Sequence, residues 1–311
     1  MAKSIRKMLI TAKIEAVSGT DSNPTPSLNA ILAKSINPQP IVAEFIDRGI
    51  VRPYFGNSQV LPAGVHSRVE FEVELQGSGS AGTAPAWGPL LRGCAFEEIT
   101  PTAGTSVEYR PISEDFETLT LYVYMDELRF KMTGCLGTVA FDFTSKAVPV
   151  MRFAFIGIQD DMTDVVMPID TDYSDFLDPK TVSRVNTPTI TLHGVSNCVQ
   201  SLTCDMQNQL IWRDLMGCGG AHISNRTPNG QLVMEMTKVS DKNWMQIIKN
   251  GSLDAINLVH GSVAGYIVEV AAPKTQFTNP QFTDQDGILM LSTGVSFNPN
   301  AGNDEFVLIA R

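Results

Sequence analysis

Residues 68–75 (RVEFEVEL) alternate without exception between charged and apolar side chains. In an extended strand, successive side chains point to opposite faces, so this segment has one apolar and one charged face. A helix would scatter the same residues around its axis. The segment therefore predicts a strand that lays one face on a core and the other in water.

The same period of two recurs along most of the chain. It predicts further strands at 118–125, 128–134, 137–145, 148–157, 187–195, 199–212, 231–239, 262–273, 287–297 and 304–311. Asp126-Glu127 and the segment from Gly134 to Gly137 fit tight reversals between the early strands. Connections this short predict antiparallel sheets rather than βαβ units.

Two short segments, 82–96 and 240–251, break this pattern with helical spacing, the second with Ser240 as its predicted N-cap. Three large apolar residues fall at i, i+3 and i+4 in each, on one helix face. They are Trp87, Leu90 and Leu91 in the first segment, and Trp244, Ile247 and Ile248 in the second. Helices this short are unstable alone, so each is expected to cover an apolar sheet face.

Residues 160–179 carry seven aspartates, two prolines and no basic residue, which predicts a solvated linker. The expected organisation is an N-terminal arm (1–35), a first β domain (36–160), an acidic linker (161–186) and a second β domain (187–311). Each domain is predicted to be an antiparallel β-sandwich or barrel with a short flanking helix. The two domains suggest a diverged duplication, with either Trp244 or Trp212 as the counterpart of Trp87.

The chain has 311 residues and a net charge of −10, which argues against a nucleic-acid-binding surface built from clustered Lys and Arg. No apolar run approaches the roughly 18 residues of a membrane span, and no secretory signal is recognisable. Charged residues make up only 18%. That low share fits either a surface buried between subunits or a β protein rich in Thr, Ser, Asn and Gln.

Reactive side chains do not form a recognisable site. His193, Cys198, Cys204, Cys218 and His222 lie within 30 residues but lack the close ligand pairs of zinc sites. The glycine-rich GSGSAG lacks the Gly-Lys-Ser/Thr of a P-loop, and no nucleophile motif is present. We therefore expect no catalytic residue, no metal and no cofactor, and we expect the function to reside in surfaces.

Four segments carry a resemblance to a known family. They are SGTDSNPTPSLNAIL (18–32), VEFEVELQGSGSAGTAPAWGPLLRGCAFEE (69–98), SNRTPNG (224–230) and GNDEFVLIAR (302–311). With them, essentially the whole chain resembles the two-domain major tail tube proteins of bacteriophages with long, non-contractile tails. The resemblance implies a structural, non-enzymatic protein of the virion tail that is assembled in the cytoplasm of the host bacterium.

The resemblance also implies how the chain would assemble. Trimeric rings with pseudo-sixfold symmetry would stack into a tube that conducts DNA without binding it specifically. Partners would be further copies of the chain, and the tail terminator, tape measure and distal tail proteins. Residues 1–35 and the loop 47–64 are expected to order only when rings stack, since both combine Pro, Gly and polar residues with isolated apolar anchors.

In such a tube, the face of each sheet opposite its helix would line the lumen. The expected lumen-facing residues are Glu70, Glu72 and Glu74 in the first domain, and Thr203, Asp205, Gln207 and Gln209 in the second. The alternative function is a β-sandwich module that binds a carbohydrate or a receptor. Such a module would expose aromatic residues on a sheet face, whereas the aromatic residues here share strand faces with aliphatic ones.

Overall fold

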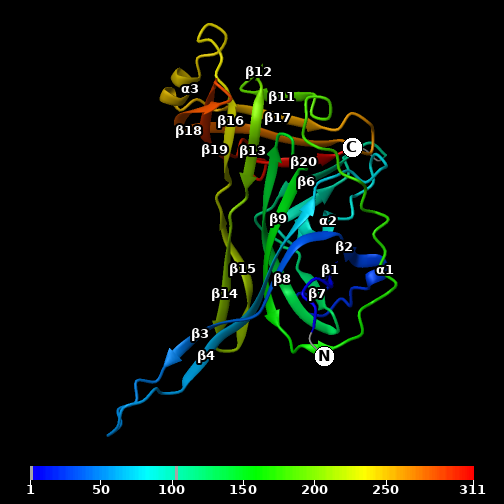
Figure 1. Cartoon of the computed structure of the whole chain (residues 1–311), viewed down its shortest axis with the longest axis vertical. Helices are drawn as coiled ribbons and strands as arrows, with labels where there is room; N and C mark the ends of the chain where they lie inside the picture. Colours follow the sequence, from blue (N-terminus) through cyan, green and yellow to red (C-terminus); the bar gives the residue numbers. More distant parts are fainter. Residues whose placement is uncertain (1–2, 102–103) are drawn as a thin grey trace.

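The computed structural model describes residues 3–101 and 104–311. Its secondary structure is mainly β, with helices of four to seven residues (Figure 1). The first half contains β1 (Met8–Ile14), α1 (Pro26–Asn29), β2 (Ala30–Ile31), β3 (Ala33–Asp47), β4 (Val60–Glu74), α2 (Gly88–Arg92), β5 (Phe96–Ile99), β6 (Val107–Pro111), β7 (Leu119–Met125), β8 (Leu128–Thr144), β9 (Val150–Gln159) and β10 (Thr163–Asp164). The second half contains β11 (Thr189–Leu192), β12 (Val195–Ser196), β13 (Val199–Asp205), β14 (Asn208–Leu215), β15 (Cys218–Arg226), β16 (Asn229–Glu235), α3 (Trp244–Asn250), β17 (Asp254–His260), β18 (Val268–Gln285), β19 (Ile288–Asn298) and β20 (Val307–Ala310).

Eight strands form one continuous antiparallel sheet, here called the central sheet. Their order is β3–β4–β9–β8–β13–β16–β19–β18. The first four strands come from the first half of the chain and the last four from the second half. The junction is the pairing of β8 with β13, which aligns Ala140–Thr144 with Asp205–Ser201. The predicted mainly β class and its antiparallel pairing are thus confirmed.

One face of the central sheet is covered by the hydrophobic core. On β4 this covered face carries Val69, Phe71 and Val73, each at most 2% exposed. Their cross-strand neighbours on β9 are Phe155, Phe153 and Met151, which are equally buried. On the opposite face, the same strands carry polar residues such as Glu70, Glu72 and Arg152, together with small ones such as Ala154.

Both predicted helix segments lie on the covered face. Trp87 precedes α2 directly, and it is fully buried with Leu90 and Leu91. Gly93, which ends α2, lies so close to Phe155 of β9 that an added Cβ would be 3.2 Å from its ring. In the second half, the indole of Trp244 contacts Phe277 of β18, with ring centroids 5.9 Å apart. Trp244 is also fully buried, while Ile247 and Ile248 are half-buried against the core.

The two halves share a single core. Phe141 of β8 stacks on Phe306, near the C-terminus, at 4.7 Å, and Phe306 meets Phe297 of β19 edge-on. Strand β20 pairs with β18 on one side and with β6 on the other. Since sheet and core both run through the two halves, the division into two tandem domains remains a prediction.

Residues 8–14 of the predicted N-terminal arm belong to the fold itself. They form β1, which pairs along its whole length with β7. Leu9 and Ile10 are at most 2% exposed. The expectation that residues 1–35 order only when rings stack is therefore wrong for this segment, because the sheet already satisfies its backbone and the core its side chains.

Two predicted strand boundaries are also wrong. Residues 128–144 form the single strand β8, and Gly134 marks a bulge rather than a reversal. Gly134 has a φ of +58°, a backbone conformation that glycine adopts without strain. This conformation lets one extra residue fit into the strand ladder. Conversely, residues 199–212 are not one strand. They divide into β13 and β14 at Gln207, whose φ is +46°.

The predicted N-cap of the second helix is also wrong. Asn243 caps α3 in place of Ser240, since its side chain accepts a hydrogen bond from the backbone N–H of Gln246.

The structure also places the two candidates for the counterpart of Trp87. Trp212 lies on β14 and Trp244 opens α3 on the covered face, which favours Trp244.

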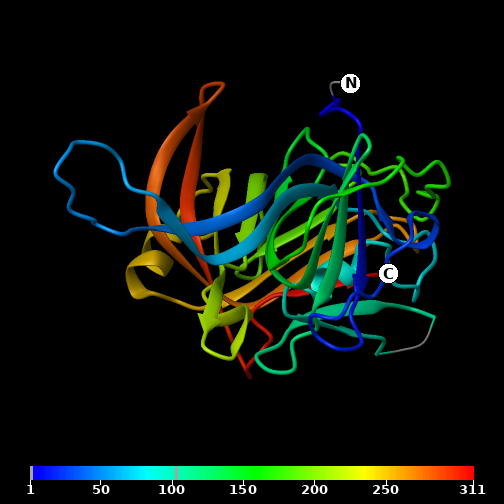
Figure 2. The same cartoon turned by 90° about the horizontal axis from the view of Figure 1, so that it is seen from below.

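Two hairpins extend from the lower end of the molecule. The β3–β4 hairpin reaches furthest, and Figure 2 shows it projecting well beyond the rest of the chain. The β14–β15 hairpin runs beside it (Figure 1). His66 of β4 stacks on Trp212 of β14 at 5.1 Å, and the backbone N–H of Gly64 donates to the Asp214 carboxylate at 3.1 Å. The two hairpins are therefore joined to each other.

Candidate functional site

The polar face of the central sheet is the candidate functional site, and it is called the uncovered face below. On β4 it carries Glu70, Glu72 and Glu74, which are half-buried and alternate with the core residues. These three glutamates are brought onto one face by the strict alternation of the strand. On the same face, β9 carries Arg152 opposite Glu72, and the next strand, β8, carries Asp142.

Each of the three glutamates contacts a cation of the same chain. The Glu70 carboxylate accepts from Arg68 at 2.6 Å, and Glu74 contacts Lys34 of β3. Arg152 donates to Glu72 at 3.0 Å. This part of the face is therefore a network of ion pairs.

Arg152 lies at the centre of this network. Besides its bond to Glu72 on β4, it donates to Asp142 on β8 at 2.9 Å. The hydrogen bond to Glu72, followed by the contact with Asp142, raises the pKa of the Arg152 guanidinium above its ordinary value. Arg152 is not among the residues predicted from the sequence, although its alternation with Met151 and Phe153 places it on the polar face.

Residues from the second half join the same face. Thr203 and Asp205 of β13 lie opposite Asp142 and Ala140 of β8. A shallow hollow on this face is lined by residues from both halves of the chain. They include Glu70, Glu72, Thr138, Ala140, Arg152, Ala154 and Asp205. The tertiary structure thus brings together side chains more than a hundred residues apart.

The other two predicted residues of the second half lie at or beyond the edge of the face. The Gln207 amide donates to Asn229 of β16 at 3.3 Å, so this side chain remains at the end of β13. Gln209 lies on β14, outside the central sheet, and its side-chain oxygen accepts from Ser224 of β15 at 3.1 Å. The break at Gln207 separates these two residues from the strand that the sequence predicted.

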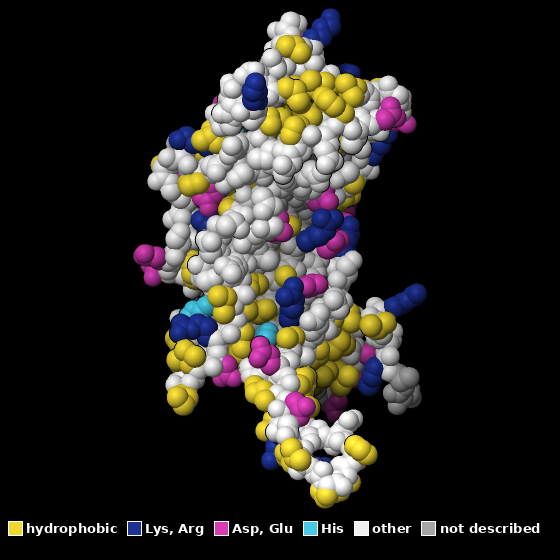
Figure 3. Space-filling view, turned by 90° about the vertical axis from the view of Figure 1, so that its left-hand side faces the viewer, with side chains coloured by type: hydrophobic (Ala, Val, Ile, Leu, Met, Phe, Trp, Pro, Cys, Tyr) yellow, Lys and Arg dark blue, Asp and Glu magenta, His cyan; other side chains and the backbone are white. Residues whose placement is uncertain are grey.

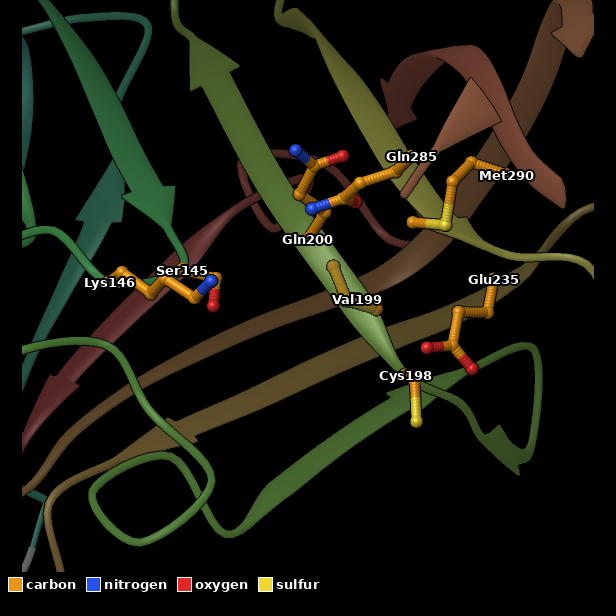
Figure 4. Close-up of a pocket in the computed structure, with 8 residues that line it drawn as sticks. All are labelled: Ser145, Lys146, Cys198, Val199, Gln200, Glu235, Gln285 and Met290. Carbon is orange, nitrogen blue, oxygen red and sulfur yellow. The ribbon is translucent and has the colours of Figure 1, made fainter. Parts of the chain in front are cut away.

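The histidine and cysteine cluster is not brought together. His193 is buried against Phe277, and Cys204 lies in the core, where burial raises the pKa of its thiol. Cys198 lines a surface pocket with Glu235, Ser145, Lys146, Gln285 and Met290 (Figure 4). Burial and the Glu235 carboxylate raise the pKa of the Cys198 thiol, which opposes a nucleophilic thiolate. Over residues 3–101 and 104–311, no group of His, Cys, Asp and Glu side chains is arranged to hold a metal ion.

Exposed apolar side chains gather toward both ends of the long axis (Figure 3). At the tip of the β3–β4 hairpin, Val51 and Phe55 are almost wholly exposed. At the other end, the β18–β19 hairpin exposes Phe282, Ile288 and Leu289 by more than half. Exposed apolar patches of this kind mark surfaces that bind another protein molecule.

Comparison with known proteins identifies the family. The family model described as phage tail tube protein matches residues 6–298, nearly the whole chain. No curated protein matches the chain. Within the described part of the chain, no helix has the length and apolarity needed to cross a membrane. This chain is therefore a structural, non-enzymatic component of the virion tail, and it belongs to the phage tail tube protein family.

Proposed function

We propose that three copies of this chain close into a ring, that rings stack into the tail tube, and that the uncovered face lines the DNA channel. The observation that carries the proposal is the face itself. It spans eight strands and holds polar side chains from both halves, such as Glu72, Arg152 and Asp205, which remain partly or fully exposed in the single chain. A sheet with a core on one side and water on the other suits a channel wall one sheet thick.

The width of the central sheet favours three chains per ring. Adjacent strands lie about 4.8 Å apart, so eight strands span roughly 38 Å of wall. Three copies would close a barrel of twenty-four strands with a diameter of about 37 Å, before strand tilt enlarges it. That channel fits a hydrated DNA duplex, whereas six copies would give twice the diameter. Since each half supplies four strands, the three-chain ring has sixfold pseudo-symmetry.

The charge pattern of the face suits a channel that does not hold DNA. Phosphate contacts with Lys and Arg would retard the duplex. Lys34, Arg68 and Arg152 each contact a carboxylate of the same chain, which competes with any phosphate. The sheet face also carries small side chains such as Ala140 and Ala154. A hydrated, charge-balanced wall would therefore guide the duplex without binding it.

The alternative function, a carbohydrate- or receptor-binding module, has less support. Such a module would present aromatic side chains on an exposed sheet face. Here Phe71, Phe153 and Phe155 stack on one another on the covered face. The aromatic residues of β4 and β9 thus belong to the core, and the polar face offers no stacking platform on these strands.

Native mass spectrometry and cryo-EM of assembled particles test the proposal. We expect rings of three chains with Glu72 and Arg152 facing the axis. A ring of six whole chains, or a channel wall that places these two residues on the outside of the tube, contradicts it.

A further inference from the structure

The β3–β4 hairpin is weakly supported in the part nearer its tip. Strand β9 pairs with β4 only from Ser67 to Glu74, so residues 60–66 pair with β3 alone in the described part of the chain. A two-stranded hairpin by itself is only marginally stable in water. The ladder between β3 and β4 is also irregular at three places, two of them between Gln39 and Glu44. Such irregularities bend a strand, so this ladder alone does not fix where the tip points.

The β14–β15 hairpin contacts this weakly supported part at two points. Trp212 of β14 stacks on His66 of β4, with ring centroids 5.1 Å apart and ring planes 18° apart. Two residues further along each strand, the Asp214 carboxylate accepts a hydrogen bond from the N–H of Gly64 at 3.1 Å. Trp212 and Asp214 lie on the same side of β14, because they are two positions apart. Two contacts spaced along a strand fix its direction as well as its position.

The base of the β14–β15 hairpin is attached to the first half of the chain. Asn208 and Arg226 face each other there as the first residue pair of the two strands. The buried Asn208 amide donates to the carbonyls of Cys94 and Gly137, at 2.8 and 3.0 Å. Cys94 follows α2, and Gly137 belongs to β8. One side of the base is therefore fixed to the body of the first half.

Arg226 fixes the other side of the base. Its guanidinium donates to the Glu305 carboxylate at 2.6 Å, and both side chains are at most 12% exposed. It also donates to the carbonyl of Ile112, which follows β6, at 2.7 Å, and to the Asn303 side chain at 3.2 Å. Removing one partner of a buried ion pair strongly destabilises a fold. The hairpin is therefore anchored at its base by buried polar groups, and it contacts β4 further out.

We propose that the β14–β15 hairpin fixes the direction in which the β3–β4 hairpin extends, with Trp212 and Asp214 as the positioning residues. A hairpin of the second half, anchored in the first half, thus supports a hairpin of the first half (Figure 1). This inference goes beyond the proposed function, because it concerns the single chain. Its consequence for the tube rests on the proposed function. All β3–β4 tips of one ring would point in the same direction.

A distance measurement in the unassembled full chain tests this support. The parent variant carries Cys198→Ser and Cys218→Ser, because these are the exposed native cysteines. Spin labels are attached at Ile46→Cys, an exposed position of β3 near the tip, and at Asp161→Cys, an exposed position just beyond β9. Double electron–electron resonance then gives the distribution of distances between the two labels. We expect a single narrow distribution in the parent.

Truncating the positioning residues should broaden this distribution. We expect Trp212→Ala combined with Asp214→Ala to at least double its width, with unchanged amide hydrogen exchange in β8 and β9. Arg213→Ala is the matched control, since Arg213 lies between the two and points to the opposite side of β14. His66→Ala removes the same stacking from the β4 side, so it should also broaden the distribution, and no further when added to Trp212→Ala. A distribution that stays narrow in both variants overturns the proposed support.

Assembly of the same variants separates this inference from the proposed function. We expect the unlabelled Trp212→Ala, Asp214→Ala variant to form three-chain rings in native mass spectrometry, but tubes at least tenfold shorter in negative-stain microscopy. Arg213→Ala should give tubes of normal length. Normal tubes from a variant with a broadened distribution would overturn the consequence for stacking. If the wild-type chain forms no three-chain rings, the proposed function fails, while the distance measurement still decides whether the hairpin is supported.

Discussion

At the scale of single residues, the Trp87 side chain explains how so short a helix as α2 is held. Its indole N–H donates to the carbonyl of Gln76 at 2.8 Å, and its ring contacts Tyr109 at 5.1 Å. The side chain is fully buried. Tertiary contacts therefore replace the intrinsic stability that five residues cannot supply.

Trp87→Ala should destabilise the chain by about 3–5 kcal/mol, because it removes a buried aromatic ring and leaves a cavity. The Gln76 carbonyl also loses its donor. Chemical denaturation of the full chain measures the change. Phe55→Ala is the matched control, since that ring is fully exposed and its loss should stay within about 0.5 kcal/mol. Equal effects of the two substitutions would contradict the packing role of Trp87.

Two buried histidines predict a loss of stability at mildly acidic pH. Burial lowers the pKa of His193 and of His260 below the ordinary value of 6.5. The unfolded chain therefore binds protons more readily than the folded one. The stability they contribute is complete above pH 6.5, and it is lost as the pH falls through 6.5 toward the lower folded values.

Urea midpoints measured at about pH 7 and about pH 5 test this, since the ordinary pKa of carboxyl groups lies lower, near 4. We expect the wild-type midpoint to fall over this range. The His193→Gln, His260→Gln double variant should show a smaller fall, and His222→Gln, which changes an exposed histidine, should behave as wild type. A double variant with an unchanged pH dependence would exclude the two histidines as its source.

At the scale of elements, the β3–β4 hairpin extends far beyond what its own fold needs. Its tip, residues 48–59, exposes Ile50, Val51, Tyr54 and Phe55. The strands behind the tip are held by β9 and by the β14–β15 hairpin, so the tip adds little to the single chain. We infer that it contacts the next ring of the stack.

Replacing residues 49–58 with Asn-Gly should separate stacking from folding. This dipeptide favours a tight hairpin turn, so the strands should stay paired. We expect an unchanged unfolding midpoint and intact rings, with tube length in negative-stain microscopy reduced by at least tenfold. A control that replaces only Asn57-Ser58 with Ala-Ala should form tubes of normal length. Normal tubes from the shortened hairpin would rule out its role in stacking.

At the scale of the whole molecule, one sheet and one core join both halves of the chain. The covered face supplies most of the buried core, which leaves the uncovered face free for the role in a channel wall that we propose for it. Its charge can therefore be changed with little effect on the fold, because ion pairs exposed to water contribute only about 0–1 kcal/mol each.

Changing Glu70, Glu72 and Glu74 together to Lys should slow DNA passage. The substitutions place new cations beside Lys34, Arg68 and Arg152, and this cluster would bind phosphates in a salt-dependent manner. We expect particles that adsorb normally but eject DNA at least tenfold more slowly at low salt. The matching triple change to Gln breaks the same ion pairs without adding positive charge, and it should eject normally. Wild-type ejection by the Lys variant would be incompatible with a channel-facing position.

The sequence by itself determined the fold class and much of the candidate face. Period-two alternation is local, since neighbouring residues on a strand always point to opposite faces. It therefore placed Glu70, Glu72, Glu74, Thr203 and Asp205 on polar strand faces. The same local logic marked the helix segments around Trp87 and Trp244.

Only the tertiary structure decided how those strands join and where they end. Strand order and cross-strand partners depend on contacts between residues that are far apart in the sequence. Local periodicity contains no information about those contacts. The Glu72–Arg152 ion pair and the pairing of β8 with β13 follow from such contacts. The bulge at Gly134 and the break at Gln207 depend likewise on backbone angles that the surrounding sheet imposes. Sequence fixed which face of each strand is polar, and packing decided that these faces form one surface.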